Sequence, residues 1–115
     1  FRIQGWKRLY CNAHTFGVEP NIHSDDGDFT MIYYPQMDWK IEWGGGTFVY
    51  KEDAETVDTI AEYRGNRVLM FDAHLPHQAQ PVAKNCLELR MCVVFKLWNE
   101  AANRDRLDFY KDTVS

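Results

Sequence analysis

Residues 87–97, LELRMCVVFKL, form the longest β-strand that the sequence predicts, because apolar and β-branched side chains dominate the segment. Arg90 lies near the start of this largely apolar stretch. An arginine in an apolar strand is costly to bury unless it contacts an anion, so Arg90 predicts a carboxylate partner. That partner is either an acid of this chain, such as Glu88, or a bound molecule.

Shorter predicted strands precede this one, and turn residues separate them. Pro20, Pro35 and the pair Gly65-Asn66 are the clearest breaks. Many short strands with such breaks are typical of a β-sandwich or barrel. The expected strands before residue 87 are residues 6–14, 29–34, 47–50, 57–63 and 67–71.

The length of 115 residues fits a single domain over residues 1–115. The polar tail at residues 99–110 predicts a short C-terminal helix after the last strand. Apolar side chains make up 45% of the chain, which is enough for a modest core. The side chains expected in that core include Met31, Met70, Met91, Phe71 and Phe95.

Charge and cysteine content narrow the classes of function. The net charge is −4 and the basic residues are dispersed, which argues against a nucleic-acid or membrane-surface partner. No apolar run approaches the roughly 20 residues of a membrane span. The three cysteines form no CxxC motif and are odd in number, which favours free thiols and a cytoplasmic location.

A possible metal site begins in the segment NIHSDDGD, where His23 and Asp25 stand two positions apart. In an extended strand, residues i and i+2 point to the same side, so both side chains can reach one ion while Ser24 points away. The plainer interpretation is a surface histidine beside a solvated acidic loop. His-x-Asp is common by chance and needs a third ligand.

Two histidines of the segment HLPHQAQPV, His74 and His77, are candidates for that third ligand. Two imidazoles and one carboxylate on one face of a metal leave the opposite face open, as in non-haem Fe(II) oxygenases. The open positions allow O2 and a co-substrate to bind side by side. Taken alone, each histidine is equally explained as an ordinary turn residue.

The order of these features resembles the 2-oxoglutarate/Fe(II) dioxygenases, in their prolyl 4-hydroxylase-like branch, from about residue 9 to residue 98. In that branch a strand is followed by His-x-Asp, a strand ending in Ile-Tyr-Tyr, an Asp-Trp loop, Gly-Gly, Pro-His and a strand with an arginine. In this chain the corresponding residues are His23-Ser24-Asp25, Ile32-Tyr33-Tyr34, Asp38-Trp39, Gly45-Gly46, Pro76-His77 and Arg90.

The resemblance implies a role for each matching residue. His23, Asp25 and His77 would bind Fe(II), and these three are the expected catalytic residues. Arg90 would pair with the distal carboxylate of 2-oxoglutarate, assisted by the hydroxyl of Tyr34. An arginine fork with a phenol donor suits a carboxylate. The family also implies an all-β double-stranded β-helix, or jelly roll, and ascorbate as a reductant.

The chain departs from the family pattern in three ways. The interval from His77 to Arg90 is 13 positions (90 − 77), which requires a larger turn. The first strand lacks an aromatic residue at the usual distance from His-x-Asp. Asn12 and His14 lie near that place, with Tyr10 on the same face, and both are expected to contact the co-substrate. The supporting N-terminal helices of the family are missing.

The function implied is hydroxylation of an unactivated C–H bond of a peptidyl, including prolyl, or small amino-acid-like substrate. O2 is consumed and 2-oxoglutarate is converted to succinate. A halogenase of this fold lacks the carboxylate that Asp25 provides. The remaining alternatives are a cupin-like metal-binding barrel, which has no need of Arg90 and Tyr34, and a catalytically silent relative, which would have a broken triad.

Overall fold

The computed structural model describes residues 5–98, with side chains from residue 8 onward. The C-terminal helix expected at residues 99–110 lies outside this part of the chain. Within the described residues, no helix has the length and apolar character needed to cross a membrane. All three cysteines are free thiols, and Cys11 is the exposed one.

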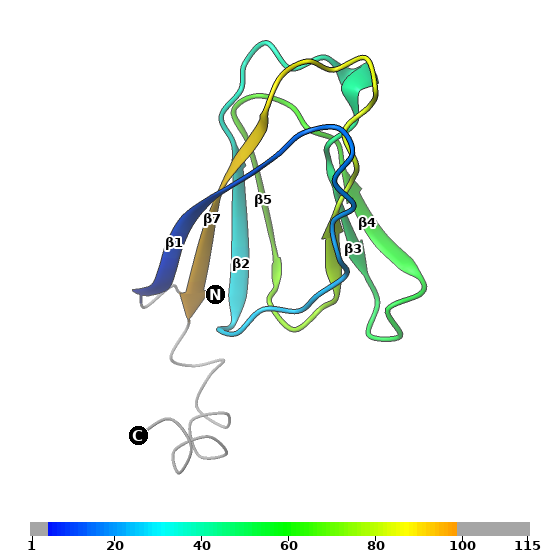
Figure 1. The fold of residues 1–115 in the computed structure, drawn as a ribbon. Coiled ribbons are helices and arrows are strands. Elements are labelled where there is room, and N and C mark those ends of the chain that lie inside the picture. The colour runs from blue at the N-terminus through cyan, green and yellow to red at the C-terminus, as the bar shows by residue number, and fades with distance from the viewer. Residues whose placement is uncertain (1–4, 99–115) are drawn as a thin grey trace, which may run out of the picture.

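Two antiparallel sheets form the fold (Figure 1). The larger sheet has the strand order β1-β7-β2-β5 and the smaller one β4-β3-β6. The strands are β1 (Gly5–His14), β2 (Phe29–Tyr34), β3 (Thr47–Tyr50), β4 (Val57–Ala61), β5 (Arg67–Asp72), β6 (His77–Ala79) and β7 (Arg90–Trp98), with one 3-10 helix, η1 (Ile41–Trp43).

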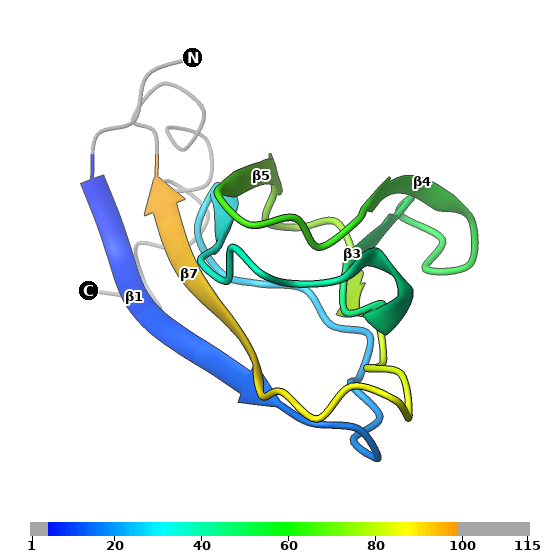
Figure 2. The same cartoon turned by 90° about the horizontal axis from the view of Figure 1, so that it is seen from above.

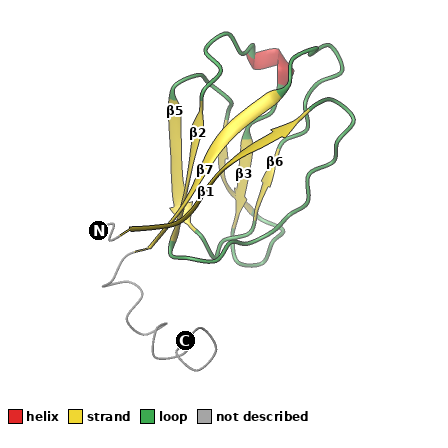
Figure 3. Cartoon of the chain, turned by 60° about the vertical axis from the view of Figure 1, so that its left-hand side comes forward, coloured by secondary structure: helices red, strands yellow, loops and turns green. Residues whose placement is uncertain are grey.

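The chain passes repeatedly from one sheet to the other. It crosses between β2 and β3, between β4 and β5, between β5 and β6, and between β6 and β7. Viewed from above, the larger sheet curves beside the smaller one (Figure 2), and the side view shows both sheets running in the same general direction (Figure 3). This mainly-β, jelly-roll-like arrangement confirms the expected fold class.

The predicted strands are found with small shifts at their ends. β4 ends at Ala61 rather than residue 63, and β7 begins at Arg90 rather than residue 87. β6 was not predicted, because three residues after Pro76 carry too little pattern to mark a strand. The residues before β7 are exposed, and Leu87 is 96% exposed.

The core lies on the inner face of the larger sheet. Its buried members are Ile32, Tyr34, Tyr63, Cys92 and Val94, with Phe71 packed against them. The expectation that the methionines fill the core is wrong. Met70 is 40% exposed, and Met31 is its cross-strand partner on the outer face.

Met91 and Phe95 are likewise only half-buried on that outer face. Successive strand residues point to opposite sides, and these strands are apolar on both. The sequence pattern therefore did not tell which side faces the core.

Candidate metal and co-substrate site

Backbone hydrogen bonds hold the loop that carries His23 and Asp25 against the segment between β5 and β6. His23 and His77 exchange two such bonds, N to O, of 3.0 and 2.8 Å. The Asp25 amide donates to the carbonyl of Ala73 at 2.9 Å. His-x-Asp is therefore not part of a regular strand, as its spacing suggested, but an extended loop paired at one residue.

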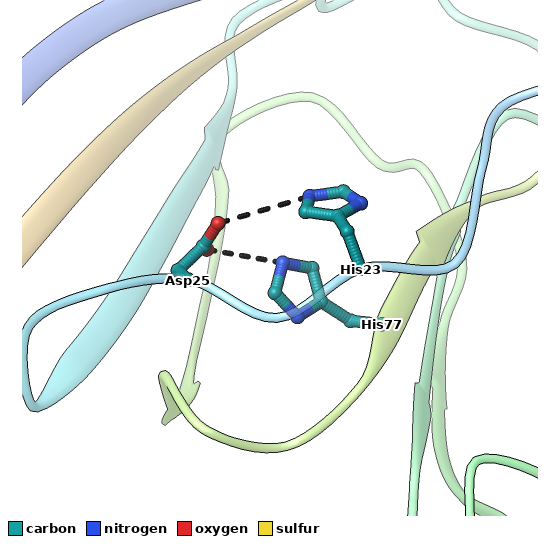
Figure 4. Close-up of side chains that lie close together, drawn as sticks. All are labelled: His23, Asp25 and His77. Atoms are coloured by element: carbon teal, nitrogen blue, oxygen red, sulfur yellow. Dashed lines mark ion pairs between the residues drawn. The ribbon is translucent and has the colours of Figure 1, made fainter.

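This pairing brings three potential ligands together (Figure 4). The Nε2 atom of His77 is 3.0 Å from Oδ2 of Asp25, and the Nε2 atom of His23 is 3.8 Å from Oδ1. The side chains of His77 and Asp25 are about 5% and 4% exposed, whereas His23 is 51% exposed. His74 is exposed and stays outside the group, so His77 is the histidine that completes it.

Both imidazoles present Nε2 to the centre of the group, because the other ring nitrogen is already engaged. Nδ1 of His23 lies 3.0 Å from the carbonyl of Asn21, and Nδ1 of His77 lies 2.9 Å from that of Leu75. A carbonyl only accepts, so each Nδ1 donates its proton to one, and Nε2 is the ring nitrogen that each histidine presents to Asp25. Metal-binding histidines are held in this way.

A divalent cation could replace the contacts between these ring nitrogens and the carboxylate, since the candidate ligand atoms all lie within 4.8 Å of one another. Ligand atoms that lie about 2.1 Å from an octahedral ion at right angles are about 3.0 Å apart. The separation between His77 Nε2 and Asp25 Oδ2 is 3.0 Å. The donor set, two imidazoles and one carboxylate, is the one that non-haem iron takes.

Two residues that sequence reasoning missed surround Asp25. Thr30 of β2, fully buried, donates its hydroxyl to Oδ2 at 2.7 Å, and Nζ of Lys96 in β7 lies 3.5 Å from Oδ1. Burial works to raise the pKa of Asp25, but hydrogen bonds from His77 and Thr30 and the charge of Lys96 hold it well below its ordinary value. Asp25 is thus an anion available to a metal.

Arg90, at the start of β7, is 2% exposed and carries its charge into the interior. Its guanidinium donates to the carbonyls of Gly45 and Gly46 and to the sulfur of Cys92. These contacts use three of the five N–H groups of an arginine, which leaves two (5 − 3). No carboxylate within the described residues pairs with it, so the alternative of an ion pair with Glu88 is not found.

Arg90 and the three candidate ligands line one cavity between the two sheets. Asn12 and Tyr10 of β1 line it as well, and so does Thr47 of β3. A cavity with metal-ligand atoms along one wall and a buried cation with free donors along another is suited to a small dicarboxylate that also chelates a metal.

Comparison with known proteins agrees with this site. The model of the 2OG-Fe(II) oxygenase superfamily matches residues 10–98. The chain belongs to this superfamily. Membership implies Fe(II) as the metal and 2-oxoglutarate as the co-substrate, and it makes the chain a relative of oxidoreductases of the dioxygenase class. No curated protein matches the chain.

Solved structures show the same fold at low sequence identity. A prolyl hydroxylase from Trichoplax adhaerens, in complex with a peptide of the hypoxia inducible factor oxygen degradation domain, has a TM-score of 0.67 and 18% identity, covering 89% of this chain and 48% of its own. A Pseudomonas putida prolyl-4-hydroxylase has a TM-score of 0.63 and 15% sequence identity, and the match covers 83% of this chain and 55% of that protein. A prolyl 4-hydroxylase from Phytophthora capsici has a TM-score of 0.64 and 17% sequence identity, and the match covers 90% of this chain and 39% of that protein. The chain thus spans about half or less of each.

The hydroxyl of Tyr34, which was expected to contact the co-substrate, points to Thr47. The two hydroxyls lie 2.6 Å apart and both residues are buried. Thr47, not Tyr34, lines the cavity. Burial raises the pKa of Tyr34, so it stays a neutral phenol that can donate. A direct contact between Tyr34 and 2-oxoglutarate stays a prediction.

His14 pairs with Arg90 across β1 and β7 and lines a second hollow, outside the first, that reaches His23 and Asn21. Its Nε2 atom is buried without a hydrogen-bond partner in the described part of the chain. Burial and the charge of Arg90 lower the pKa of His14, against the effect of the Gln80 carbonyl. His14 is therefore a neutral imidazole with one unused polar atom beside the expected co-substrate position.

Proposed function

We propose that this chain is the catalytic core of a 2-oxoglutarate- and Fe(II)-dependent hydroxylase that acts on an unactivated C–H bond of a peptidyl substrate, including prolyl residues. The same hydroxylation of a small amino-acid-like substrate is also part of the proposal. The family model matches residues 10–98, so we assign the proposed activity to this domain.

One observation carries the proposal: an intact His23, Asp25 and His77 group shares its cavity with a buried arginine that has no acidic partner among the described residues. A cupin-like metal site has no need of that arginine. A silent relative has no need of the preserved triad.

Fe(II) with 2-oxoglutarate and O2 supplies the oxidising power that places a hydroxyl on carbon while the keto acid becomes succinate and CO2. The chain holds and orients the reactants. We assign the metal to His23, Asp25 and His77, and the distal carboxylate to the free N–H groups of Arg90 with the Thr47 and Tyr34 hydroxyl pair beside it.

Asn12 and His14 are proposed as further contacts on the co-substrate side. Asn12 lines both the inner cavity and the outer hollow, and it offers an amide donor and acceptor. The unused Nε2 of His14 is beside Arg90 in register. The exposed face of His23 leaves the outer hollow as the side from which a substrate approaches.

The substrate part of the proposal rests on similarity. The Trichoplax adhaerens protein was solved with a peptide of the hypoxia inducible factor oxygen degradation domain, and all three similar structures are prolyl hydroxylases. Their identity to this chain is at most 18%, so peptide panels, with proline and other side chains at the target position, are the proper substrates to test.

The test is succinate formation from 2-oxoglutarate with Fe(II) and ascorbate, coupled to a mass increase of one oxygen in a peptide or amino acid. His77→Ala should abolish both products. His74→Ala, the same change three residues away at an exposed histidine, is the matched control and should retain them. Turnover that survives His77→Ala would overturn the proposed function.

A further inference from the structure

Lys96 stands out among the lysines of the described chain because its ammonium is turned toward a candidate metal ligand. Its side chain is only 12% exposed, whereas lysines are mostly solvent-exposed. Nζ lies 3.5 Å from Oδ1 of Asp25 and 3.2 Å from Oδ1 of Asp26. The stem of Lys96 is fixed in β7, directly opposite Thr30 in β2.

Lys96 and Thr30 divide the two oxygens of Asp25 between them. The Thr30 hydroxyl donates to Oδ2, which also faces His77, and Lys96 is beside Oδ1. Because Thr30 and Lys96 are neighbours across two paired strands, both contacts are set by the sheet rather than by a loop. The ring of Tyr10, 5.6 Å from Nζ, closes one side of the ammonium.

From this arrangement we infer that Lys96 is a positioning residue that keeps Asp25 from binding the metal through both carboxylate oxygens. The inference rests on the proposed function and concerns the number of positions left open on the metal. With Oδ1 held by the ammonium, Oδ2 is the single ligand oxygen. Three protein ligands on an octahedral ion then leave about three positions for water, co-substrate and O2.

The same charge weakens the hold of the site on a divalent ion. Lys96 places one positive charge 3.5 Å from a carboxylate oxygen of the ligand set, and the Asp26 carboxylate that also pairs with it is 72% exposed to solvent, which screens its charge. An ammonium this close to a ligand oxygen repels a divalent cation strongly at the effective dielectric of a protein. Lys96 therefore lowers the affinity of the site for a metal ion while it keeps coordination positions on that ion open.

The test uses Mn(II) as the probe and measures its dissociation constant and the water-proton relaxivity of the bound ion. Lys96→Met should tighten Mn(II) binding by about tenfold or more, because the repulsion is lost and Oδ1 becomes free to chelate. Relaxivity per bound ion should fall by about one third as one of three bound waters is displaced. Lys96→Arg, which retains the charge, should restore both values.

Lys84→Met is the matched control, since it removes one exposed lysine charge away from the triad and should change neither value. Unchanged or weaker Mn(II) binding with unchanged relaxivity in a folded Lys96→Met chain would overturn the inference alone. Mn(II) binding by the wild-type chain that is insensitive to His23→Ala and His77→Ala would overturn the proposed function and this inference with it.

Discussion

At the scale of single residues, the ionised form of Asp25 is a source of stability that depends on pH. Its folded-state pKa lies below the ordinary value of about 3.9, so its contribution is complete above that value and is lost as pH falls through the folded-state pKa. In metal-free chains, Asp25→Asn should cost about 2 kcal/mol of unfolding free energy at pH 7.

That difference should shrink as the pH is lowered from about 5 toward about 2, because the carboxylate takes up a proton in the unfolded chain before it does so in the folded chain. Urea unfolding at several pH values with a chelator present measures it. Asp26→Asn, at a side chain that is 72% exposed, should change stability by less than about 0.5 kcal/mol throughout. If the difference in unfolding free energy between Asp25→Asn and the wild type did not depend on pH, the assignment of Asp25 as an anion would be wrong.

The planar guanidinium of Arg90 leads to a second prediction at the scale of single residues. Arg90→Lys retains charge without the planar pair of donors, and it should weaken 2-oxoglutarate binding to the Mn(II)-loaded chain by about tenfold. Arg90→Met should weaken it by about a hundredfold. Titration calorimetry measures both, and Arg67→Met, at a half-buried arginine whose guanidinium donates to the Glu62 carbonyl, is the control. Equal affinity in Arg90→Met would exclude the role.

The sequence predicted the residues with a spacing signature and missed those without one. His23 and Asp25 stand two apart, and Arg90 is a charged residue in a largely apolar strand, so each was visible. Thr30 and Lys96 are 66 positions apart (96 − 30) and become neighbours only through strand register. No local pattern contains that register, and the pairing of Tyr34 with Thr47 was hidden for the same reason.

At the scale of elements, the approach of β3 to β4 depends on Gly46. A Cβ at Gly46 would lie 2.2 Å from the carbonyl oxygen of Ala61, a backbone atom that has no easy way to yield. Gly46→Ala should therefore destabilise the fold by about 3 kcal/mol or more and displace the carbonyl that Arg90 uses. Gly17→Ala is the control.

Gly17, unlike Gly46, has a left-handed conformation, φ +96°, and nothing lies within 4 Å of the added carbon. Gly17→Ala should lower the unfolding free energy by about 1 kcal/mol, from backbone strain alone. Chemical unfolding of both variants separates steric conflict from conformational strain. Similar losses of unfolding free energy at the two glycines would contradict the close approach at Gly46.

Element boundaries and faces were only partly predictable. Strong β-formers bounded by turn residues predicted six of the seven strands in place, with β2 and β3 matched end to end. The face that each strand turns to the core was not predictable, because Met31 and Ile32 are equally apolar neighbours. Only the pairing of the sheets decides that Ile32 is buried and Met31 is not.

At the scale of the whole molecule, the proposed site spans both sheets, and ligand binding should hold them together. Arg90 comes from the larger sheet, His77 and Thr47 come from the smaller sheet, and His23 and Asp25 come from the loop that joins β1 to β2. Among residues 5–98 no strand pairing joins the two sheets into one, so a metal and a dicarboxylate would add cross-links to side-chain contacts such as that between Tyr34 and Thr47. Ligands that bind only the folded state stabilise it in proportion to their affinity.

Mn(II) and 2-oxoglutarate, each at about 100 times its dissociation constant, should each add about 2.7 kcal/mol, which raises Tm by roughly 10 °C or more per ligand for a domain of this size. Thermal unfolding of three chains distinguishes the two contributions. The wild type should gain from both ligands, Arg90→Met from Mn(II) alone, and Asp25→Ala from neither, because the keto acid needs the metal to chelate. A chelator should reverse the metal gain. If 2-oxoglutarate stabilises Asp25→Ala as much as it does the wild type, the dicarboxylate binds without the metal, and the two halves of the cavity do not act as one site.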